Sequence, residues 1–469
     1  MNGLRVQDVL DSTGAQLQRG RADARLAGVG TDTRSLRPGE LFLALSGPNF
    51  DGNLFAMEAL EKGAGGLLLR ATGGSPAPTL LGEAPVLLHR DPHRALADLA
   101  AWHRERLRIP VVGITGSCGK TTVKDLVRQL LSSCRRVVAS PRSFNNAIGV
   151  PLTLLGAAPE TEVLVAEIGT NQPGEIAALC RIARPTAGVV TNIGAAHLER
   201  LGSLEGVARE KADLVAAVPR DGFVVLNADC RFTPLVSSYA SAPTRTFSVE
   251  GDGELDAREL VFHSGGTTFR LHGAGPDSIE LTSPLLGTHN VQNLLAALLV
   301  CRGLGLAFDD VLPEVSRLVG GRQRMERREL AGITLFDDSW NSNPDSARAA
   351  VRVLSGLHGF GRRVLVLGDM LELGEFAAEM HHRIGMEAAQ AGVDLIVPVG
   401  ELGRAAAAGA LEAGLAPAAV VHLATTEEAL ERVPELLREG DVVLVKGSRG
   451  MALERLIGRL EGQLGAQGA

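Results

Sequence analysis

The sequence lacks the segments that would place a chain in or across a membrane. No apolar run approaches the ~20 residues that a membrane-spanning helix needs. The first residues, MNGLRVQDVLDSTGAQ, also lack the basic segment followed by an apolar run that a signal peptide requires. We therefore expect a cytoplasmic protein without a membrane span.

Paired cysteines and an excess of positive charge are missing as well. The five cysteines have no CxxC spacing, so neither a disulfide framework nor a zinc cluster is indicated, and we expect buried, reduced side chains. They are Cys118, Cys134, Cys180, Cys230 and Cys301. The net charge of -7 gives no electrostatic reason to expect nucleic acid or an anionic membrane as the main partner. Any phosphate site must therefore be local.

The sequence does have the composition of a chain that folds throughout. Hydrophobic residues make up 45% and charged residues 22%, which is ordinary for a globular protein. At roughly 150 residues per domain, the 469 residues suggest about three domains. A Gly- and Pro-rich stretch at 71–85 and a glycine pair within 318–326 mark two breaks. We expect domains at residues 1–83, 84–319 and 320–469.

The pattern of apolar runs predicts an α/β fold. In the central domain, the β-branched runs VVGIT, TEVLVAEI, AGVVTNI and GFVVLNAD alternate with helical segments. This pattern favours a P-loop-type, mostly parallel sheet with helices on both faces, although residues 244–286 look more hairpin-like. The runs RRVLVLGDM, VDLIVPVG and DVVLVKGS, each before a predicted helix, indicate a Rossmann-like C-terminal domain. The N-terminal piece predicts a small α/β domain.

The stretch VVGITGSCGKTTVKDLV, residues 111–127, predicts a phosphate-binding loop between a buried strand and a helix. Such a turn directs backbone N–H groups and the helix N-terminus at an anion, and Gly116 and Gly119 permit a close approach. Lys120 would neutralise the β- and γ-phosphates, and the Thr121 hydroxyl would coordinate Mg²⁺. The strict GxxxxGK[ST] pattern is not met, because Ile114 stands at the first glycine position. A purely structural turn is the alternative.

A metal–nucleotide site needs a further carboxylate at the end of a neighbouring strand, and VLVAEIGTN supplies Glu167. The alternative is that Glu167 caps a helix. His197 follows another strand, where a further metal or phosphate contact would enter, although a lone histidine is more often structural. Lys211 lies on a predicted helix and by itself reads as a solvated charge.

Ten motifs in order resemble one family, the ATP-dependent Mur ligases of peptidoglycan synthesis, over nearly the whole chain. They are DTRSLRPGELFLALSGPNFDG, ITGSCGKTT, NNAIGVPLTLL, EIGTNQPGEI, TNIGAAHLERLGS, GTHNVQNLLAAL, GRQRME, DDSWNSNP, LGDMLELG and KGSRGMALE. EIGTNQPGEI and DDSWNSNP are most similar to the member that adds a dipeptide. The DNPR stretch associated with diaminopimelate addition is absent.

The resemblance implies a reaction with two cofactors, ATP and Mg²⁺. The carboxylate of a UDP-N-acetylmuramoyl-tripeptide would attack the γ-phosphate of ATP, and the amine of D-Ala-D-Ala would displace phosphate from the resulting acyl phosphate. The first domain would bind the UDP-sugar, the central domain ATP, and the last domain would close to complete the nucleotide and amine sites. We expect a monomer.

The resemblance also implies the site residues. The catalytic residues would be Lys120, His197 and Lys211, and the metal would be held by Thr121, Glu167, His197 and a carbamylated Lys211. ATP would be bound by Gly116, Ser117, Gly119, Lys120, Thr121, Thr122, Asn290, Asn293, Arg324, Asp338, Asn341 and Asn343. Substrate would be bound by Asn145, Asn146, Thr170 and Asn171, and its uridine nucleotide by Asp32 and Arg34. No firm role is implied for Lys446 or Arg449.

Other interpretations stay open at this point. DDSWNSNP is also the pattern of an Asx-rich turn that caps a helix, and Asp32 with Arg34 is also the pattern of a surface ion pair. Thr33, Asn53, Cys118, Trp340 and Ser342 depart from the residues expected of the family, although none removes a charged or metal-binding group. The rival functions are a sister Mur ligase or a folylpolyglutamate synthetase that adds a single amino acid, and a P-loop ATPase switch.

Overall fold

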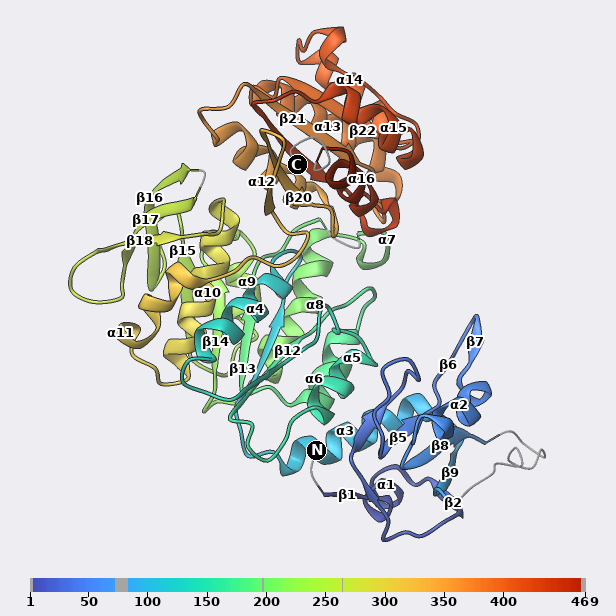
Figure 1. The fold of residues 1–469 in the computed structure, drawn as a ribbon. Coiled ribbons are helices and arrows are strands. Elements are labelled where there is room, and N and C mark those ends of the chain that lie inside the picture. Colours follow the sequence, from blue (N-terminus) through green and yellow to red (C-terminus); the bar gives the residue numbers. More distant parts are fainter. Residues whose placement is uncertain (1–2, 72–82, 196–197, 264, 465–469) are drawn as a thin grey trace.

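The computed structural model describes residues 3–71, 83–195, 198–263 and 265–464. Three α/β units follow one another along the chain, coloured blue, cyan to yellow, and orange to red in Figure 1. Each unit is built on its own sheet. The expected α/β class with a mostly parallel central sheet is confirmed.

The first unit is a small five-stranded sheet with the order β2-β9-β8-β5-β4. Its strands are β2 (Gln16–Arg19), β4 (Gly28–Gly30), β5 (Glu40–Leu43), β8 (Gly66–Arg70) and β9 (Val86–His89). The unit also holds β1 (Leu4–Arg5), β3 (Arg25–Leu26), β6 (Ser46–Gly47), β7 (Phe50–Asp51), α1 (Val6–Thr13), η1 (Gly52–Phe55) and α2 (Ala56–Glu61). Because β9 pairs with β8 and β2, the predicted boundary at residue 83 falls before the last strand of this sheet.

The central unit is a nine-stranded sheet with the order β11-β12-β10-β13-β14-β15-β16-β17-β18. Its strands are β10 (Val111–Thr115), β11 (Val137–Ala139), β12 (Val163–Glu167), β13 (Ala187–Val190), β14 (Phe223–Asn227), β15 (Thr244–Ser248), β16 (Leu255–His263), β17 (Gly266–His272) and β18 (Ile279–Ser283). Pairing is parallel from β11 through β16 and antiparallel from β16 through β18. The hairpin expected within 244–286 is therefore present, but β15 belongs to the parallel part.

Helices cover both faces of the parallel strands. They are α3 (Pro92–Arg106), α4 (Lys120–Leu131), α5 (Gly149–Leu155), α6 (Glu175–Ala183), α7 (Leu198–Leu201), α8 (Leu204–Ala217), α9 (Thr233–Ser237), α10 (Thr288–Gly303), α11 (Phe308–Val311) and η2 (Leu312–Arg317). Alternate residues of a strand point to opposite faces, so Val112 packs with α4 and α10 while Val111 packs with α3, α5 and α6. With both faces buried, the loops at the strand ends are left to form a site.

The last unit is a five-stranded sheet with the order β19-β20-β23-β21-β22, of which only β19 is antiparallel. Its strands are β19 (Glu326–Leu330), β20 (Ile333–Asp338), β21 (Arg362–Gly368), β22 (Leu395–Val399) and β23 (Asp441–Lys446). Its helices are α12 (Pro344–Gly356), η3 (Gly374–Phe376), α13 (Ala377–Gln390), α14 (Gly403–Glu412), η4 (Pro417–Ala419), α15 (Thr426–Leu436), η5 (Arg449–Met451) and α16 (Glu454–Leu464). Hydrophobic clusters on both faces confirm the Rossmann-like prediction.

The structure bears on the expected absence of a membrane span and on the expected burial of the cysteines. In the residues described, no helix is both long and apolar enough to cross a bilayer. All five cysteines are free, but only Cys180 and Cys301 are buried. The expectation of buried thiols is wrong for Cys134, which is exposed near the end of α4, and for Cys118 and Cys230, which are partly exposed in loops.

Candidate functional site

A cavity of about 530 Å³ lies between the central and last units. The central unit lines it with the loop after β10, the segments after β12 and β13, and the start of α10, while the last unit contributes the segment after β20 and the start of α12. The carboxyl ends of parallel strands share one edge of a sheet, which is where ligands bind in open α/β folds. The sequence motifs that follow separate strands are therefore brought together at one place.

Two glycines give the loop after β10 its shape. Gly116 has a φ of +150°, and a Cβ there would lie under 3.0 Å from Thr191 Oγ1. Gly119 has a φ of +82°, and a Cβ there would lie under 3.0 Å from Asn293 Oδ1. A side chain at either position would therefore collide with the neighbouring strand end or with α10.

The two residues between these glycines anchor the loop to the segment after β13. Ser117 Oγ donates to Gly194 O at 3.0 Å, and Gly194 N donates back to Ser117 Oγ at 2.9 Å. The Cys118 backbone N–H donates to Asn192 Oδ1 at 2.9 Å. The loop is thus held by hydrogen bonds that do not need a ligand.

Lys120 begins α4, and its side chain folds back over the loop. Its Nζ donates to Gly116 O at 2.6 Å. Burial lowers the pKa of Lys120, and the negative charge of Glu167 opposes that effect. The next residue, Thr121, accepts a hydrogen bond at its Oγ1 from Arg324 Nη2 at 3.1 Å, and Thr122 also lines the cavity. The ammonium and the hydroxyl are both placed where a phosphate at the N-terminus of α4 would meet them.

Glu167 ends β12 inside the cavity wall and is only 1% exposed. Its Oε1 accepts a hydrogen bond from Asn145 Nδ2 at 2.8 Å. Its buried Oε2 has no hydrogen-bond partner in the part of the chain that the structure describes. A buried carboxylate oxygen without a partner is costly. This oxygen fits the ligand set of a hard divalent cation.

The two other predicted metal ligands are His197 and Lys211. His197 lies outside the described residues. Lys211 on α8 is buried, so the interpretation as a solvated charge is wrong. Burial, with a smaller contribution from the Lys120 charge, lowers the pKa of Lys211 to about 7. Among the described residues no group of three His, Cys, Asp or Glu could hold a metal alone, so a cation here would need ligands from elsewhere.

The start of α10 lines another wall of the cavity with Asn290 and Asn293. Asn290 Nδ2 donates to Leu286 O at 2.8 Å, and Asn293 Nδ2 donates to Asn290 Oδ1 at 3.4 Å. His289 beside them was not singled out by the sequence, because one histidine in an apolar helix carries little signal. Its Nδ1 is buried without a partner among the described residues, and burial lowers its pKa to about 4.

The last unit presents Arg324, Asp338 and Asn341 to the same cavity. Asp338 Oδ2 forms an ion pair with Lys446 Nζ at 2.6 Å, and Lys446 Nζ also donates to Asn341 O at 3.0 Å. The Lys446 side chain is buried although its charge lines the cavity. Lys446, which the sequence left without a role, therefore fixes the segment that carries Asp338 and Asn341.

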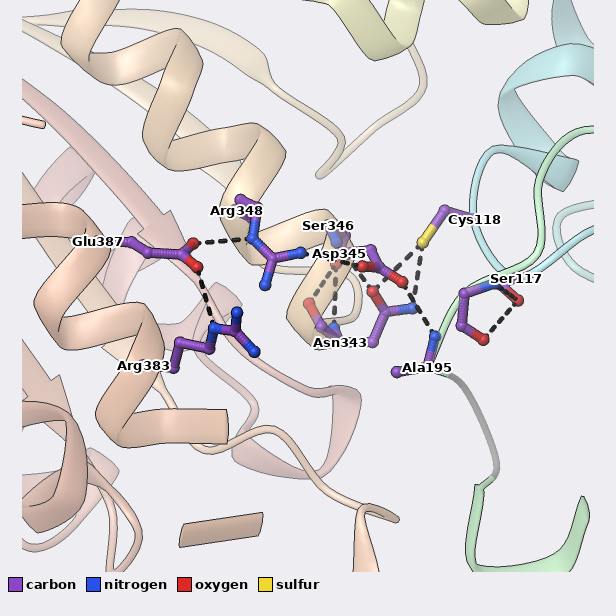
Figure 2. A network of polar contacts seen from close by, with 10 residues as sticks. Ser117, Cys118, Ala195, Asn343, Asp345, Ser346, Arg348, Arg383 and Glu387 are labelled. Atoms are coloured by element: carbon purple, nitrogen blue, oxygen red, sulfur yellow. Dashed lines mark hydrogen bonds and ion pairs between the residues drawn. The ribbon is translucent and has the colours of Figure 1, made fainter. Parts of the chain in front are cut away.

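The N-terminus of α12 meets the phosphate loop directly, as Figure 2 shows. Asn343 caps α12 by accepting a hydrogen bond from Ser346 N at 2.9 Å, and its Nδ2 lies 3.1 Å from Cys118 Sγ. Asp345 Oδ2 accepts a hydrogen bond from Ala195 N at 3.0 Å. Both Asn343 groups therefore have protein partners, and DDSWNSNP does contain a helix cap, at Asn343 with α12 beginning at Pro344.

Charges behind this contact tie α12 to α13. Arg348 Nη1 lies 3.2 Å from Asp345 Oδ1, and Arg348 Nε lies 2.8 Å from Glu387 Oε2 (Figure 2). Arg383 pairs with the other oxygen of Glu387 at 3.6 Å (Figure 2). The carboxylate that reaches the central unit is thus held by a network within the last unit.

The predicted substrate residues fall into two places. Asn145, Asn146, Thr170 and Asn171 line the cavity. Asn146 Oδ1 also accepts hydrogen bonds from Ile148 N and Gly149 N at the start of α5. Asp32 and Arg34 are not among the cavity residues; they form an exposed ion pair of 2.6 Å on the first unit, and Arg34 is 86% exposed.

Comparisons with known proteins agree with this arrangement. Residues 114–301 match the Mur ligase middle domain, and residues 323–449 match the Mur ligase, glutamate ligase domain. The chain is 36% identical to the UDP-N-acetylmuramoyl-tripeptide–D-alanyl-D-alanine ligase of Escherichia coli, over 98% of this chain and 99% of that one. It is similar to the MurF structure from Acinetobacter baumannii, with a TM-score of 0.88 at 29% identity over 99% of this chain and 100% of that one. It is also similar to the MurF ligase from Thermotoga maritima in complex with ADP, with a TM-score of 0.81 at 27% identity over 95% and 100%.

Replacing Gly119 by alanine tests the shape of the loop. Gly119→Ala should weaken ADP binding at least about tenfold, because the new Cβ meets Asn293 as well as an unfavourable φ. Titration calorimetry with ADP measures the change. The matched control is Gly14→Ala, where φ is +71° but nothing lies within 4 Å of the new Cβ. Equal ADP affinity in both variants would contradict this account of the loop.

His289, whose Nδ1 is buried, predicts a pH dependence of stability. Its folded pKa of about 4 lies below the ordinary value of 6.5, so the folded state favours the neutral ring. The associated stability is present above pH 6.5 and is lost as the pH falls toward 4, by at most about 3 kcal/mol at ~1.4 kcal/mol per pKa unit. Over this window the chain should lose more stability than His289→Gln. Thermal melts of both proteins between pH 7 and 4 measure the difference, and parallel curves would refute it.

Proposed function

This chain belongs to the Mur ligase family, and from that premise we propose how its residues join D-alanyl-D-alanine to a UDP-N-acetylmuramoyl-tripeptide. The chain is an ATP-dependent amide ligase of peptidoglycan precursor synthesis. The observation that carries the proposal is the cavity itself. It brings Lys120, Glu167 and Arg324 from three separate motifs around one space.

The chemistry explains why an ATP site belongs in such an enzyme. A carboxylate is a poor acyl donor because its leaving group would be oxide. In the first step a carboxylate oxygen of the tripeptide bonds to the γ-phosphorus, and the bond from that phosphorus to ADP breaks. In the second step the dipeptide amine attacks the acyl carbon, phosphate leaves with the electron pair of the C–O bond, and the nitrogen loses a proton. The products are the amide, ADP and phosphate.

The phosphate loop would hold the transferring group by fixed charges and dipoles. We assign the backbone N–H groups of Gly116, Gly119, Lys120 and Thr121, with the side chains of Ser117 and Thr122 beside them, to the phosphates of ATP. The N–H groups of Ser117 and Cys118 already donate to Asn192. Lys120 would exchange its contact with Gly116 O for the phosphate oxygens, where its charge stabilises the transition state. Because the loop is already held by Ser117 and Cys118, little reorganisation is needed when ATP binds.

The residues at the end of β12 and on α4 fit a magnesium ion. Glu167 Oε2, buried without a partner among the described residues, and Thr121 Oγ1 would supply oxygen ligands. When bound, Mg²⁺ would neutralise charge on the phosphates. We assign His197 and Lys211 to the same site. A lysine carbamate at Lys211 would offer oxygens where an ammonium would repel the cation, and its lowered pKa makes the neutral amine needed for carbamylation accessible near pH 7.

The nucleotide base and the last unit complete the site in this proposal. Asn290 and Asn293 would lie near adenine, and Arg324, Asp338 and Asn341 would contact the nucleotide from the last unit. Asn343 would act through its contact with Cys118 in the loop. Closing the last unit over the loop excludes water, which would otherwise hydrolyse the acyl phosphate.

The UDP-N-acetylmuramoyl-tripeptide, which donates the acyl group, would be bound by residues of the central and first units. We assign Asn145, Asn146, Thr170 and Asn171 to the tripeptide, and Asp32 and Arg34 on the first unit to the uridine nucleotide. We propose three domains, with the first boundary placed between β9 and α3 because β9 completes the first sheet. We also propose that the protein acts as a monomer in the cytoplasm, where ATP is available.

Two rival functions make different predictions. A sister Mur ligase or a folylpolyglutamate synthetase would accept a single amino acid instead of a dipeptide. A P-loop ATPase switch would hydrolyse ATP in response to a protein partner and would not need a UDP-sugar peptide. The similarity of the whole chain to the dipeptide-adding ligase favours the proposed function over both rivals.

The choice of acceptor tests the function directly. Phosphate release from ATP, Mg²⁺ and UDP-N-acetylmuramoyl-tripeptide should be at least about 100-fold faster with D-Ala-D-Ala than with single amino acids. Lys120→Ala should lower that rate by at least about 100-fold while the circular dichroism spectrum is kept, because a phosphate contact is lost. Faster phosphate release with a single amino acid than with D-Ala-D-Ala would instead indicate a ligase that adds a single amino acid.

A chemical trap tests the intermediate. Hydroxylamine is a small nucleophile that should replace the dipeptide amine and yield a tripeptide hydroxamate together with ADP. Mass spectrometry of the product measures this, and omission of ATP is the control. ATP turnover that gives no hydroxamate would rule out a free acyl phosphate in the cavity.

A further inference from the structure

A second lysine of α4, which the proposed mechanism does not use, is almost completely buried. Lys124 lies one helical turn after Lys120, and its side chain is 2% exposed. Its Nζ donates to Ser140 O at 2.9 Å and to Arg142 O at 2.6 Å, and it lies 3.2 Å from Asp125 Oδ1. Lysine is rarely buried to this extent because its charge is costly to desolvate. We therefore asked which part of the fold depends on the hydrogen bonds of Lys124 to Ser140 O and Arg142 O.

The segment held by Lys124 is the one that holds Glu167. Ser140 Oγ accepts a hydrogen bond from Glu167 N at 3.0 Å. Asn145 Nδ2 donates to Glu167 Oε1 at 2.8 Å. The segment between these residues thus fixes both the backbone and one carboxylate oxygen of Glu167.

The backbone of this segment is strained where Lys124 binds it. Arg142 has a φ of +48°, in the left-handed region that residues other than glycine rarely adopt. Such a conformation costs on the order of 1 kcal/mol or more and persists only when the surroundings enforce it. The hydrogen bond from Lys124 to Arg142 O is one such constraint.

We propose that Lys124 is a positioning residue for the Glu167 carboxylate, acting through the segment 140–145. By keeping Ser140 and Asn145 in place, Lys124 keeps the Asn145 amide on Oε1 and leaves Oε2 for a divalent cation. Helix α4 thus carries Lys120 for the phosphates and, one turn later, the lysine that organises the metal ligand. This inference rests on the proposed function, since it takes Glu167 as a metal ligand.

The chain provides a matched control in another buried cation. Arg104 on α3 is also buried, and its guanidinium donates to the carbonyls of Ala183, Leu107 and Arg184 at 2.8, 2.8 and 2.9 Å. Arg104 is not among the residues that line the cavity. Removing either cation should affect stability, but only Lys124 should affect the response to magnesium.

The experiment measures ADP binding by titration calorimetry over a range of Mg²⁺ concentrations. Lys124→Met should raise the Mg²⁺ concentration needed for half of the affinity gain by about 10- to 100-fold, because the segment that carries Ser140 and Asn145, the direct partners of Glu167, is no longer held; this is the range for loss of a metal ligand's partners. ADP affinity without Mg²⁺ should stay within about threefold, because the phosphate loop is untouched. Ser140→Ala should shift the Mg²⁺ midpoint in the same direction, since it removes the acceptor for Glu167 N. Arg104→Met should leave the midpoint unchanged.

The outcomes separate the two proposals. If the unmodified chain shows no Mg²⁺-dependent gain in ADP affinity, the assigned metal site fails and the positioning role fails with it. If the unmodified chain responds but Lys124→Met does not shift the midpoint, or Arg104→Met shifts it equally, only the positioning role is overturned. Should Lys124→Met not fold by circular dichroism, Lys124→Gln and Ser140→Ala decide the matter, and unchanged midpoints in the folded variants reject the inference.

Discussion

The site depends on close packing between the phosphate loop and its two neighbours. Thr191, after β13, lies against Gly116, and Asn293 of α10 lies against Gly119. These contacts, with the positive φ of both positions, favour glycine and hold the loop against the strand end and α10. Residues from three separate stretches of sequence must therefore be in place before a phosphate site exists. The phosphate site therefore depends on the packing of the loop against Thr191 and Asn293 as well as on its two glycines.

Charge is distributed around the cavity in a way that the net charge of the chain does not reveal. Three cations, Lys120, Arg324 and Lys446, line it together with four carboxylates, whereas the chain as a whole carries -7. The carboxylates are those of Glu167, Glu175, Asp338 and Asp345. Each of the three cations contacts a protein acceptor, namely Gly116 O, Thr121 Oγ1 and the Asp338 carboxylate. A polyanionic ligand would compete for cations already fixed in position, which lowers the entropy lost on binding.

The sequence predicted the architecture well because its signals are local. Buried β-branched runs and the helices between them indicated the parallel sheets, and the loop before Lys120 indicated where an anion would bind. The sequence did not assign β9 to the first sheet, because its pairing with β8 and β2 is a tertiary interaction that the turn residues do not reveal. Glu167 could be singled out because it ends a strand, whereas the burial of Lys211 and the partners of Asn343 depend on packing between distant elements. His289 and Lys124 were missed for the same reason, since a single polar residue on a helix does not show what covers it.

The contact between α12 and the segment after β13 links two positions that are far apart in the chain. A Cβ at Gly194 would lie under 3.0 Å from Asp345 Oδ2, so this docking needs a residue without a side chain opposite the carboxylate. A related sequence with a larger residue at the first position would have to turn the second side chain away, shorten it, or seat its last unit differently. The pair should therefore vary together among relatives, and its covariation would report from sequence alone whether they share this seating of the last unit.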